Sequence, residues 1–477
     1  MYLGIDIGTS GVKAVILDAG GKVRAQASAP LTLSRPHPLW SEQDPADWWI
    51  ATEAAVLALP ADLRSAVEAI GLAGQMHGAT LLGADDRPLR PAILWNDGRA
   101  FAECADLEAA VPDLRQIAGN IAMPGFTAPK LAWVRRQEPA VFKAIRSVLL
   151  PKDYVRLCLT GEKASDLSDS AGTLWLDVAR RDWSDELLAA TGLTREQMPR
   201  LLEGTAISGA QRADVAARWG MGQVPVAAGA GDNAAGAAGV GVVRDGDALL
   251  SLGTSGVIFV ATSAFRPNPA GAVHAFCHCL PDMWHQMSVH LSAASCLDWA
   301  ATLTRQDVPG LLAAAEAATA GSELFLPYLS GERTPHNDPH VRGAFLGLSN
   351  DTDPGRLGLA VLEGVAFAHA DGLAVLQAAG SRVESLSVIG GGARSRFWGT
   401  ILASALGVRL DYLADGEVGP ALGAARLARI AATGASVAEV CTRPPVRESI
   451  EPDPELAERL APKLARFHAA YPAIKSI

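Results

Sequence analysis

The pentapeptide Gly-Thr-Ser-Gly-Val occurs twice in this chain, at residues 8–12 and again at residues 253–257. Each copy follows a short apolar run and leads into another, from Val12 to Leu17 and from Val257 to Val260. Two strand-like runs joined by a glycine-rich turn are the pattern of a β-hairpin. Because an internal repeat marks a duplicated structural unit, the sequence predicts two similar domains that each begin with a hairpin.

Helical periodicity alternates with short apolar runs downstream of both copies. The helical stretches run from Trp48 to Leu59, from Ala293 to Leu303 and from Gly358 to Ala378, and the strand-like runs from Val67 to Leu72 and from Ser385 to Ile389. This alternation predicts an α/β fold, and the hairpins make each sheet mixed. We expect one domain over residues 1–243 and a second over residues 244–477, hinged together without a low-complexity linker.

The composition and charge of the chain argue against several classes of function. A chain of 477 residues, 49% of them hydrophobic, is long enough for about two or three globular units. Its formal net charge of -10 is unsuited to binding nucleic acid or an anionic membrane surface. The six cysteines are too sparse for a disulfide framework, and the first residues lack the pattern of a secretory signal. We therefore expect a protein of the reducing cytoplasm.

The repeated Gly-Thr-Ser-Gly turn offers closely spaced backbone N–H groups and two hydroxyls, which are the groups that surround phosphate oxygens. An ordinary hairpin turn has the same residues, but two facing hairpins could hold successive phosphates of one nucleotide. Asp6 precedes the first copy, whereas Ser251 stands at the corresponding position before the second. A carboxylate beside a polyphosphate needs a cation, so Asp6 indicates a Mg²⁺ site, bound through water. Lys13 could neutralise a phosphate.

Asp232 is the single charged residue in a segment of very small residues, Ala-Gly-Ala-Gly-Asp-Asn-Ala-Ala-Gly-Ala. A carboxylate in such surroundings is costly unless it is paired or used in chemistry, which makes Asp232 a candidate site residue. The alternative is a helix N-cap, because a helix-like run of small residues follows it. The two roles can coexist.

Gln75, Met76 and His77 lie between two glycines, Gly74 and Gly78, directly after an apolar run. A strand should end here, and the glycines would let a ligand approach the backbone closely. Together with the segment Trp-Asn-Asp-Gly-Arg at 95–99, these residues indicate a pocket for a small polar substrate. The alternatives are that the histidine is structural and that the tryptophan belongs to the core.

Two further segments have competing interpretations. The segment from His274 to Cys279 contains possible metal ligands, but strand alternation would divide them between two faces, which favours a structural strand over a metal site. The segment Gly390–Ala393 follows an apolar strand and precedes a helix-like run from Phe397 to Leu406. Bare backbone at this turn could admit a flat group such as adenosine, although glycine turns are also common as plain connections.

Longer motifs are dispersed along nearly the whole chain. They are Ser-Arg-Pro-His-Pro-Leu-Trp-Ser-Glu-Gln-Asp-Pro at 34–45, Gln-Met-His-Gly at 75–78, Trp-Asn-Asp-Gly-Arg at 95–99, Gly-Phe-Thr-Ala-Pro-Lys-Leu-Ala-Trp at 125–133, Gly-Asp-Asn at 231–233, and Phe-Leu-Pro-Tyr-Leu-Ser-Gly-Glu-Arg-Thr-Pro-His at 325–336. In these motifs the chain resembles the FGGY carbohydrate kinases of the actin-like ATPase superfamily. The resemblance implies two actin-like, ribonuclease H-like domains with mixed sheets flanked by helices and a catalytic cleft between them.

The resemblance also implies a role for each candidate residue. Asp232 would be the catalytic base, beside Asn233 as a substrate contact, and the domain over 1–243 would bind the sugar through Gln75, Met76 and His77. Asp6 would act in catalysis at the Mg²⁺–ATP end. The nucleotide would contact Gly8, Thr9, Ser10 and Lys13 on the first hairpin and, in the nucleotide-binding domain over 244–477, Thr254, Gly391, Gly392 and Ser395.

Within this family, Gln-Met-His-Gly is most similar to members that act on D-xylulose. That similarity implies transfer of the γ-phosphoryl group of ATP to the 5-hydroxyl of D-xylulose, without a nucleic-acid or membrane partner, and it allows a homodimer. One alternative is a family kinase for another ketose or polyol. An alternative from a different class is an actin-like ATPase or chaperone, which also has duplicated phosphate hairpins. A chaperone would need a peptide-binding extension, whereas a sugar kinase needs the buried Asp232.

Overall fold

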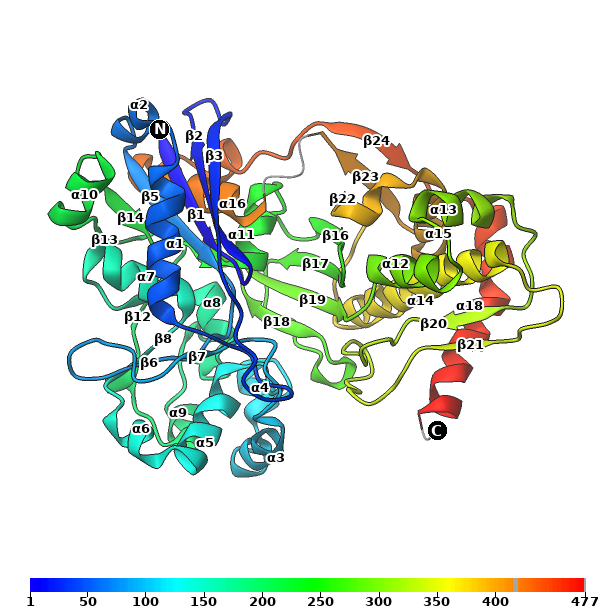
Figure 1. The fold of residues 1–477 in the computed structure, drawn as a ribbon, viewed down its shortest axis with the longest axis horizontal. Coiled ribbons are helices and arrows are strands. Elements are labelled where there is room, and N and C mark those ends of the chain that lie inside the picture. Colours follow the sequence, from blue (N-terminus) through cyan, green and yellow to red (C-terminus); the bar gives the residue numbers. More distant parts are fainter. Residues whose placement is uncertain (415–418, 476–477) are drawn as a thin grey trace.

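Two mixed seven-stranded sheets dominate the computed structural model, which describes residues 1–414 and 419–475 (Figure 1). The first sheet has the order β13-β14-β5-β1-β2-β3, with β15 also paired to β5. Its strands are β1 (Tyr2–Ile7), β2 (Gly11–Leu17), β3 (Val23–Pro30), β5 (Ala69–Gly74), β13 (Ile207–Ala210), β14 (Pro225–Ala227) and β15 (Ala230–Gly231). The central strand β1 pairs antiparallel with β2 and parallel with β5.

The second sheet repeats this arrangement in the order β18-β19-β17-β16-β22-β23-β24. Its strands are β16 (Ala248–Leu252), β17 (Gly256–Thr262), β18 (His274–Cys277), β19 (Trp284–His290), β22 (Ser385–Ile389), β23 (Arg409–Leu413) and β24 (Val446–Ile450). Its central strand β16 pairs antiparallel with β17 and parallel with β22, as β1 does with β2 and β5. The predictions of a duplicated hairpin and of mixed sheets are confirmed. The segment at 274–279, for which a structural strand was favoured, forms a strand over 274–277.

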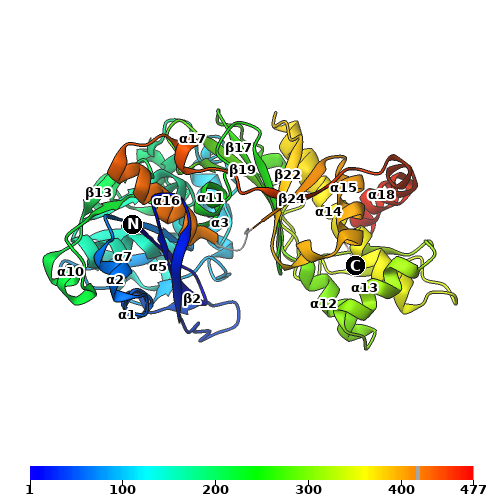
Figure 2. The same ribbon diagram turned by 90° about the horizontal axis from the view of Figure 1, so that it is seen from above.

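Helices cover both faces of the first sheet (Figure 2). On one face, α1 (Pro45–Leu57) and α7 (Pro151–Thr160) pack against the odd-numbered side chains of β1. On the other face, α16 (Gly419–Thr433) lies directly on the strand backbone. A Cβ atom added at Gly4 would lie 1.9 Å from the carbonyl oxygen of Ala421. Glycine in β1 is therefore what lets the helix approach so closely.

The same helix α16 packs against α11 (Asp232–Gly239), the helix that begins with the candidate base. The contact is again made by small residues, because a Cβ atom at Gly423 would lie 1.8 Å from the carbonyl oxygen of Ala235. After β23 the chain thus returns to the first sheet to form α16 and α17 (Val437–Val440), and then crosses back to form β24 (Figure 2). The first sheet is covered by a late segment of the chain.

The second sheet packs its even-numbered β16 residues against a helical layer that contains the long helix α14 (Pro354–Ala378). The other helices on this side are α12 (Ala294–Leu303), α13 (Val308–Ala317), α15 (Arg396–Leu406) and α18 (Pro454–Ile474). Among the described helices, α14 alone is long and apolar enough to cross a membrane, and 78% of its most apolar window is buried within the protein. It serves as a core helix here.

A mainly helical region is inserted between β5 and β13 and lies below the first sheet in Figure 1. Its helices are α3 (Phe101–Ala110), α4 (Leu114–Ala118), α5 (Thr127–Gln137), α6 (Pro139–Ala144), α8 (Leu167–Ala171) and α9 (Asp185–Thr191), and its short strands include β6 (Thr80–Leu82), β7 (Ala92–Ile93), β8 (Ser147–Leu149) and β9 (Ala164–Asp166). Side chains of this region share one apolar cluster with residues of β17, β18 and β19. The two halves of the chain are therefore in direct contact.

Candidate active site

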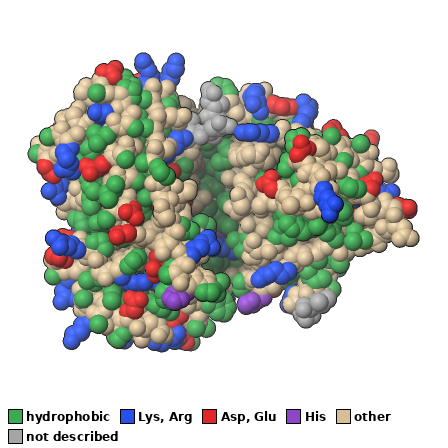
Figure 3. Space-filling view, in the orientation of Figure 1, with side chains coloured by type: hydrophobic (Ala, Val, Ile, Leu, Met, Phe, Trp, Pro, Cys, Tyr) green, Lys and Arg blue, Asp and Glu red, His purple; other side chains and the backbone are tan. Residues whose placement is uncertain are grey.

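A cavity of about 220 Å³ is lined by residues from both halves of the chain, and we call it the interdomain cavity. The first half contributes Met76, His77, Trp95, Asp232 and Asn233, and the second contributes Ser255, Val257, His274, Phe276, Met287, Val289 and Arg333. Figure 3 shows the hollow between the halves, with hydrophobic side chains inside it. A few polar groups among apolar walls are typical of a site for a small ligand.

Asp232 enters this cavity because a strand ends and a helix begins at the same point. Strand β15 pairs with β5 and ends at Gly231, which is the N-cap of α11, so Asp232 is the first helical residue and not the cap. Its Oδ1 accepts hydrogen bonds from the backbone N–H and the side-chain amide of Asn233, at 2.8 and 3.0 Å. Burial raises the pKa of Asp232 to about 6, and the bonds from Asn233 oppose this rise. The carboxylate can therefore take up a proton near neutral pH.

Asp6 lies near the end of β1 and faces Lys13 across the hairpin register. Burial and the negative charge of Asp232 raise the pKa of Asp6 to about 7, while Lys13 lowers it. Its Oδ1 is buried, and among the described residues it has no hydrogen-bond partner. An unpartnered carboxylate oxygen beside a second carboxylate suits a hydrated Mg²⁺ ion, because the cation would supply the missing positive charge.

His77 has a backbone φ of +69°, in the left-handed region that few side chains adopt. Its carbonyl oxygen accepts hydrogen bonds from the Lys130 ammonium at 2.9 Å and the Thr127 hydroxyl at 3.1 Å, which hold this conformation. Its ring Nδ1 lies 2.6 Å from the carbonyl oxygen of Gly172. A carbonyl oxygen can only accept, so Nδ1 carries the hydrogen. Burial lowers the pKa of His77 well below its usual range, so the ring is neutral and Nε2 is a hydrogen-bond acceptor.

A buried network of amides supports the tip of the first hairpin. The Thr9 hydroxyl donates to Gln75 Oε1 at 2.9 Å, and Gln75 Nε2 donates to Gln43 Oε1 at 3.0 Å. Gln43 Nε2 in turn donates to the carbonyl oxygen of Thr9 at 2.7 Å. Gln75 is only 2% exposed and does not line the interdomain cavity. The structure therefore places Gln75 behind the hairpin, where it holds Thr9.

The remaining residues of the first hairpin point elsewhere. Ser10 and Lys13 line a separate open groove of about 420 Å³, together with residues of β3. The turn itself is closed by a hydrogen bond from the Gly8 N–H to the Gly11 carbonyl oxygen, at 3.0 Å. The hairpin thus has one side near the interdomain cavity, through Thr9, and another that faces this groove.

The second hairpin and the glycine-rich turn lie together in the other half. Thr254 and Ser255 are exposed at the hairpin tip, and the Thr254 carbonyl oxygen is held by the Ala293 N–H at 2.9 Å. A Cβ atom at Gly392 would lie 3.0 Å from the side chain of Leu252, the last residue of β16. The turn is therefore adjacent to the hairpin.

Backbone at this turn is open to solvent. Gly390 has a φ of +95°, and a Cβ atom at Gly391 would have no neighbour within 4 Å among the described atoms. The Ser395 hydroxyl caps α15 by accepting from the Trp398 N–H at 3.2 Å. The exposed hairpin tip and the bare glycines form one surface on which a flat group can lie.

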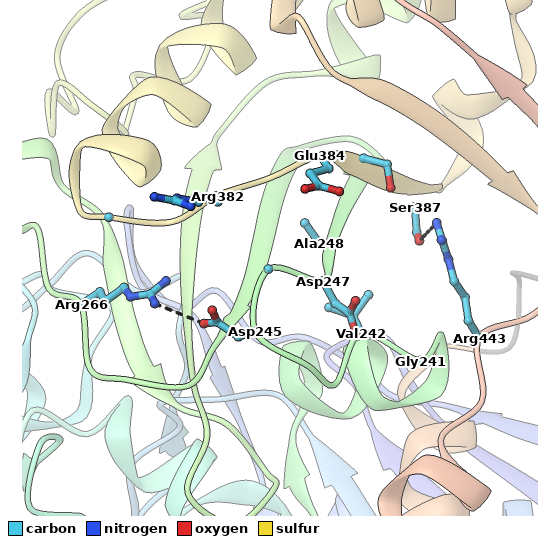
Figure 4. A pocket seen from close by; sticks show the side chains of 13 residues that line it. Gly241, Val242, Asp245, Asp247, Ala248, Arg266, Arg382, Glu384, Ser387 and Arg443 are labelled. Atoms are coloured by element: carbon cyan, nitrogen blue, oxygen red, sulfur yellow. Dashed lines mark hydrogen bonds and ion pairs between the residues drawn. The ribbon is translucent and has the colours of Figure 1, made fainter.

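A larger cavity, of about 620 Å³, lies at the starts of β16 and β22, opposite the ends that carry the second hairpin and the glycine turn (Figure 4). Arg266 in its wall pairs with Asp245 at 3.3 Å, and Arg443 donates to the Ser387 hydroxyl at 2.9 Å. None of the candidate catalytic residues lines it. Ligands of α/β sheets bind at the carboxyl ends of parallel strands, so the smaller interdomain cavity is the better candidate for chemistry.

Comparison with known proteins decides the family. Residues 1–239 match the N-terminal domain of the FGGY family of carbohydrate kinases, and residues 248–432 match its C-terminal domain. The chain belongs to this family. It is 57% identical over 477 residues to a xylulose kinase of Escherichia coli, covering 99% of this chain and 98% of the relative, and 54% identical to one of Klebsiella pneumoniae, covering both chains completely.

Solved structures of FGGY kinases agree with this assignment. A crystal structure of a xyloylose kinase from Brucella ovis has a TM-score of 0.97 at 53% identity, covering 100% of this chain and 99% of that one. A xylulose kinase from Rhodospirillum rubrum has a TM-score of 0.91 at 32% identity, covering 99% and 98%. The predictions of an α/β fold and of a carbohydrate kinase are confirmed, and the chaperone alternative is excluded.

For this FGGY kinase, sequence reasoning missed most of the far wall of the interdomain cavity. Ser255 adjoins the predicted Thr254, and Phe276 lies in a segment interpreted only as structural. Arg333 is the most polar of the missed residues, and its motif, Glu-Arg-Thr-Pro-His, was a signal that could have found it. Burial lowers the pKa of Arg333, as expected for a guanidinium withdrawn from water.

Proposed function

We propose that this chain transfers the γ-phosphoryl group of ATP to the 5-hydroxyl of D-xylulose, giving D-xylulose 5-phosphate and ADP. The observation that carries the proposal is that Met76, His77 and Asp232 meet in one cavity, in a chain whose full-length relatives include xylulose kinases. A cavity of about 220 Å³ suits a small sugar better than a larger ligand.

In this proposal the sugar is held by polar groups of opposite kinds. Neutral His77 presents Nε2 as an acceptor for a sugar hydroxyl, while Arg333 and the amide of Asn233 are available as donors. Met76, Phe276 and Met287 would contact the carbon chain. A site built to bond several hydroxyls rejects analogues that lack them, because its own polar groups are then left unpaired.

Asp232 is the base in this reaction. The 5-hydroxyl oxygen attacks the γ-phosphorus, the bond from that phosphorus to the oxygen of ADP breaks, and the hydroxyl proton passes to the Asp232 carboxylate. Its pKa of about 6 supports this role, because the side chain is mostly ionised at pH 7 and still basic enough to accept a proton. The hydrogen bonds from Asn233 hold the receiving carboxylate.

The nucleotide lies between the two hairpins in this proposal. Thr9 and the turn after β1 contact the phosphates on one side, and Thr254 contacts them on the other. The adenine ring of the nucleotide lies against Gly391 and Gly392. Mg²⁺ bound with ATP would neutralise phosphate charge, and Asp6 would hold it through water by the Oδ1 that has no partner among the described residues.

We propose that residues 1–243 bind the sugar and supply the catalytic base, Asp232, and that residues 244–477 bind most of the nucleotide. The packing of α16 on the first sheet means that the sugar-binding half also includes a late segment of the chain. Two halves that share the cavity walls can close on the substrates and exclude water, which would otherwise compete for the phosphoryl group.

A coupled assay of ADP release tests the substrate assignment. D-xylulose, L-ribulose and glycerol are supplied in turn with Mg²⁺ and ATP, and a reaction without sugar gives the background. We expect the largest kcat/KM for D-xylulose. A larger kcat/KM for glycerol or for L-ribulose would contradict the proposal and assign the cavity to another polyol or ketose.

A further inference from the structure

Helix α8 (Leu167–Ala171) connects two polar groups of the interdomain cavity. At its carboxyl end, the Gly172 carbonyl oxygen accepts the hydrogen bond from His77 Nδ1. At its amino end, the Ser168 hydroxyl accepts a 3.1 Å hydrogen bond from the backbone N–H of Gly231, the residue before Asp232. One short helix therefore contacts the segments that carry both His77 and Asp232.

The Ser168 hydroxyl is fixed in direction. It donates its single hydrogen to Asp166 Oδ2, which leaves its lone pairs for the Gly231 N–H. Asp166 Oδ2 also accepts from the backbone N–H groups of Ser168 at 2.8 Å and Asp169 at 3.2 Å, as the N-cap of α8. Ser168 and Asp166 are both fully buried.

A buried cluster of charges holds Asp166 in turn. The Lys152 ammonium lies 2.8 Å from Asp166 Oδ1, 2.7 Å from Asp153 and 2.9 Å from Asp169, and all four side chains are completely buried. One turn along α7, Arg156 donates to the Ala227 carbonyl oxygen at 2.8 Å. Arg156 thus fixes backbone that leads into Gly231, and Lys152 fixes the Asp166 carboxylate that binds Ser168.

Such a cluster is weak evidence for stability, because burying charges costs much of what their attraction gains. Its value is that it determines geometry. The N–H of Gly231 lies at the point where β15 ends and α11 begins, so a shift there moves the Asp232 carboxylate relative to the sugar. Misplacement of a reacting group by about 1 Å can cost on the order of 100-fold in rate.

We propose that Ser168 is a positioning residue for phosphoryl transfer, which acts by holding the Gly231 N–H and thereby the carboxylate of Asp232. The inference rests on the proposed function, in which Asp232 is the base. Ser168 contacts neither substrate in this proposal, and no local sequence motif indicated it.

The test compares Ser168→Ala with Ser170→Ala. Ser170 is on the same helix, is equally buried and also bonds another side chain, donating to the Ser165 hydroxyl at 2.9 Å. Among the described residues, its side chain makes no hydrogen bond to the segment at 231–233. We expect both variants to lower the melting temperature by similar amounts. Only Ser168→Ala should lower kcat, by about 10-fold, with the KM for D-xylulose changed less than about two-fold.

Two further variants keep the result interpretable. Ser168→Cys fills a similar space with a weaker hydrogen-bonding group, so it should fold and give a kcat between those of the parent and Ser168→Ala. In an Asp232→Asn background, Ser168→Ala should have little further effect on kcat, because its action is through that carboxylate.

Each outcome decides the matter. Equal kcat losses in Ser168→Ala and Ser170→Ala, or a full additional loss in the Asp232→Asn background, would overturn the positioning role while leaving the base assignment intact. Native kcat in Asp232→Asn alone would instead overturn the base assignment, and the positioning role with it.

Discussion

The indole N–H of Trp95 donates a 3.0 Å hydrogen bond to the hydroxyl of Thr9. Trp95 lines the interdomain cavity, and Thr9 lies at the tip of the first hairpin, so this bond joins the wall of the proposed sugar site to the proposed phosphate site. Because Thr9 gives its own hydrogen to Gln75, the direction of the bond is fixed. A sugar that contacts Trp95 is thereby linked to the position of the hairpin.

Replacing Trp95 with Phe should test this link. The variant keeps an aromatic ring and loses the donor, so we expect kcat/KM for D-xylulose to fall about five-fold, as for loss of one hydrogen bond of about 1 kcal/mol. The control is Trp299→Phe, because Trp299 is similarly exposed, at 37% against 39%, and stacks on Phe325 away from the cavity. Similar values of kcat/KM for the two variants would show that the hydrogen bond to Thr9 does not contribute to the reaction.

Asp232→Asn should keep the shape and most hydrogen bonding of the side chain but lose its ability to take a proton at neutral pH. We expect kcat on D-xylulose to fall by about 10²–10⁴-fold, with a normal circular dichroism spectrum and little change in ATP affinity. Titration calorimetry with a non-hydrolysable ATP analogue measures that affinity. Near-native kcat in the folded variant would direct the search to another carboxylate.

The pH dependence of the reaction follows from the same group. A base works in its ionised form, so with a pKa of about 6 for Asp232, kcat/KM should fall as the pH decreases through about 6 and level off above about 7. Initial rates between pH 5 and 8, at saturating Mg²⁺–ATP, measure this. The acidic limb should be absent from the residual activity of Asp232→Asn, and its persistence would assign the limb to a different group.

The stability of the ligand-free protein should have the opposite pH dependence at Asp6. Since burial and Asp232 raise its pKa from 3.8 to about 7, the folded state holds this proton more tightly than the unfolded chain does. The stabilising contribution is complete below about pH 4 and is lost as the pH rises to about 7. The melting temperature of Asp6→Asn minus that of the parent should therefore increase as the pH rises from 4 to 7. Calorimetry without Mg²⁺ measures this difference. A constant difference would mean that the Asp6 pKa is not raised.

Gly172→Ala should disturb the proposed sugar site and leave the proposed nucleotide site unchanged. Gly172 has an ordinary backbone conformation, but an added Cβ atom would lie 2.6 Å from the His77 ring and 2.8 Å from the end of Met76. We expect the KM for D-xylulose to rise about 10-fold and the KM for ATP to stay unchanged. Gly222→Ala is the control, because its Cβ atom would meet no described atom within 4 Å. A raised KM for ATP alone would contradict this placement of His77.

The periodic parts of the fold could be predicted from the sequence, because local pattern determines them. The hairpins at both repeats are confirmed, and β22 spans the expected residues. Helix α1 begins at Pro45, before the expected Trp48, because Asp44 caps it and proline suits the first helical turn. The periodicity of apolar residues contains no information about a polar N-cap, so the predicted start of this helix was too late in the sequence.

The parts of the site that were missed depend on long-range packing. Val257, Phe276 and Met287 reach the interdomain cavity from three neighbouring strands, and nothing in their local pattern distinguishes a cavity wall from a core. Lys152 was likewise not predicted, because its partners Asp166 and Asp169 meet it only after α7 and α8 have packed. Motif reasoning found the residues in glycine-rich loops, where the sequence itself is unusual.

The return of the chain to form α16 has a consequence for how the protein is made. The interval from Gly239, where α11 ends, to Thr433, where α16 ends, is 194 residues (433 minus 239). At about 5–20 residues per second, a ribosome needs on the order of 10–40 s to synthesise it. Throughout that time the glycine-bearing face of β1 and β5 lacks its helix. The half of the enzyme that is translated first is therefore completed only after most of the second half has been synthesised, and until then that face is uncovered on the nascent chain.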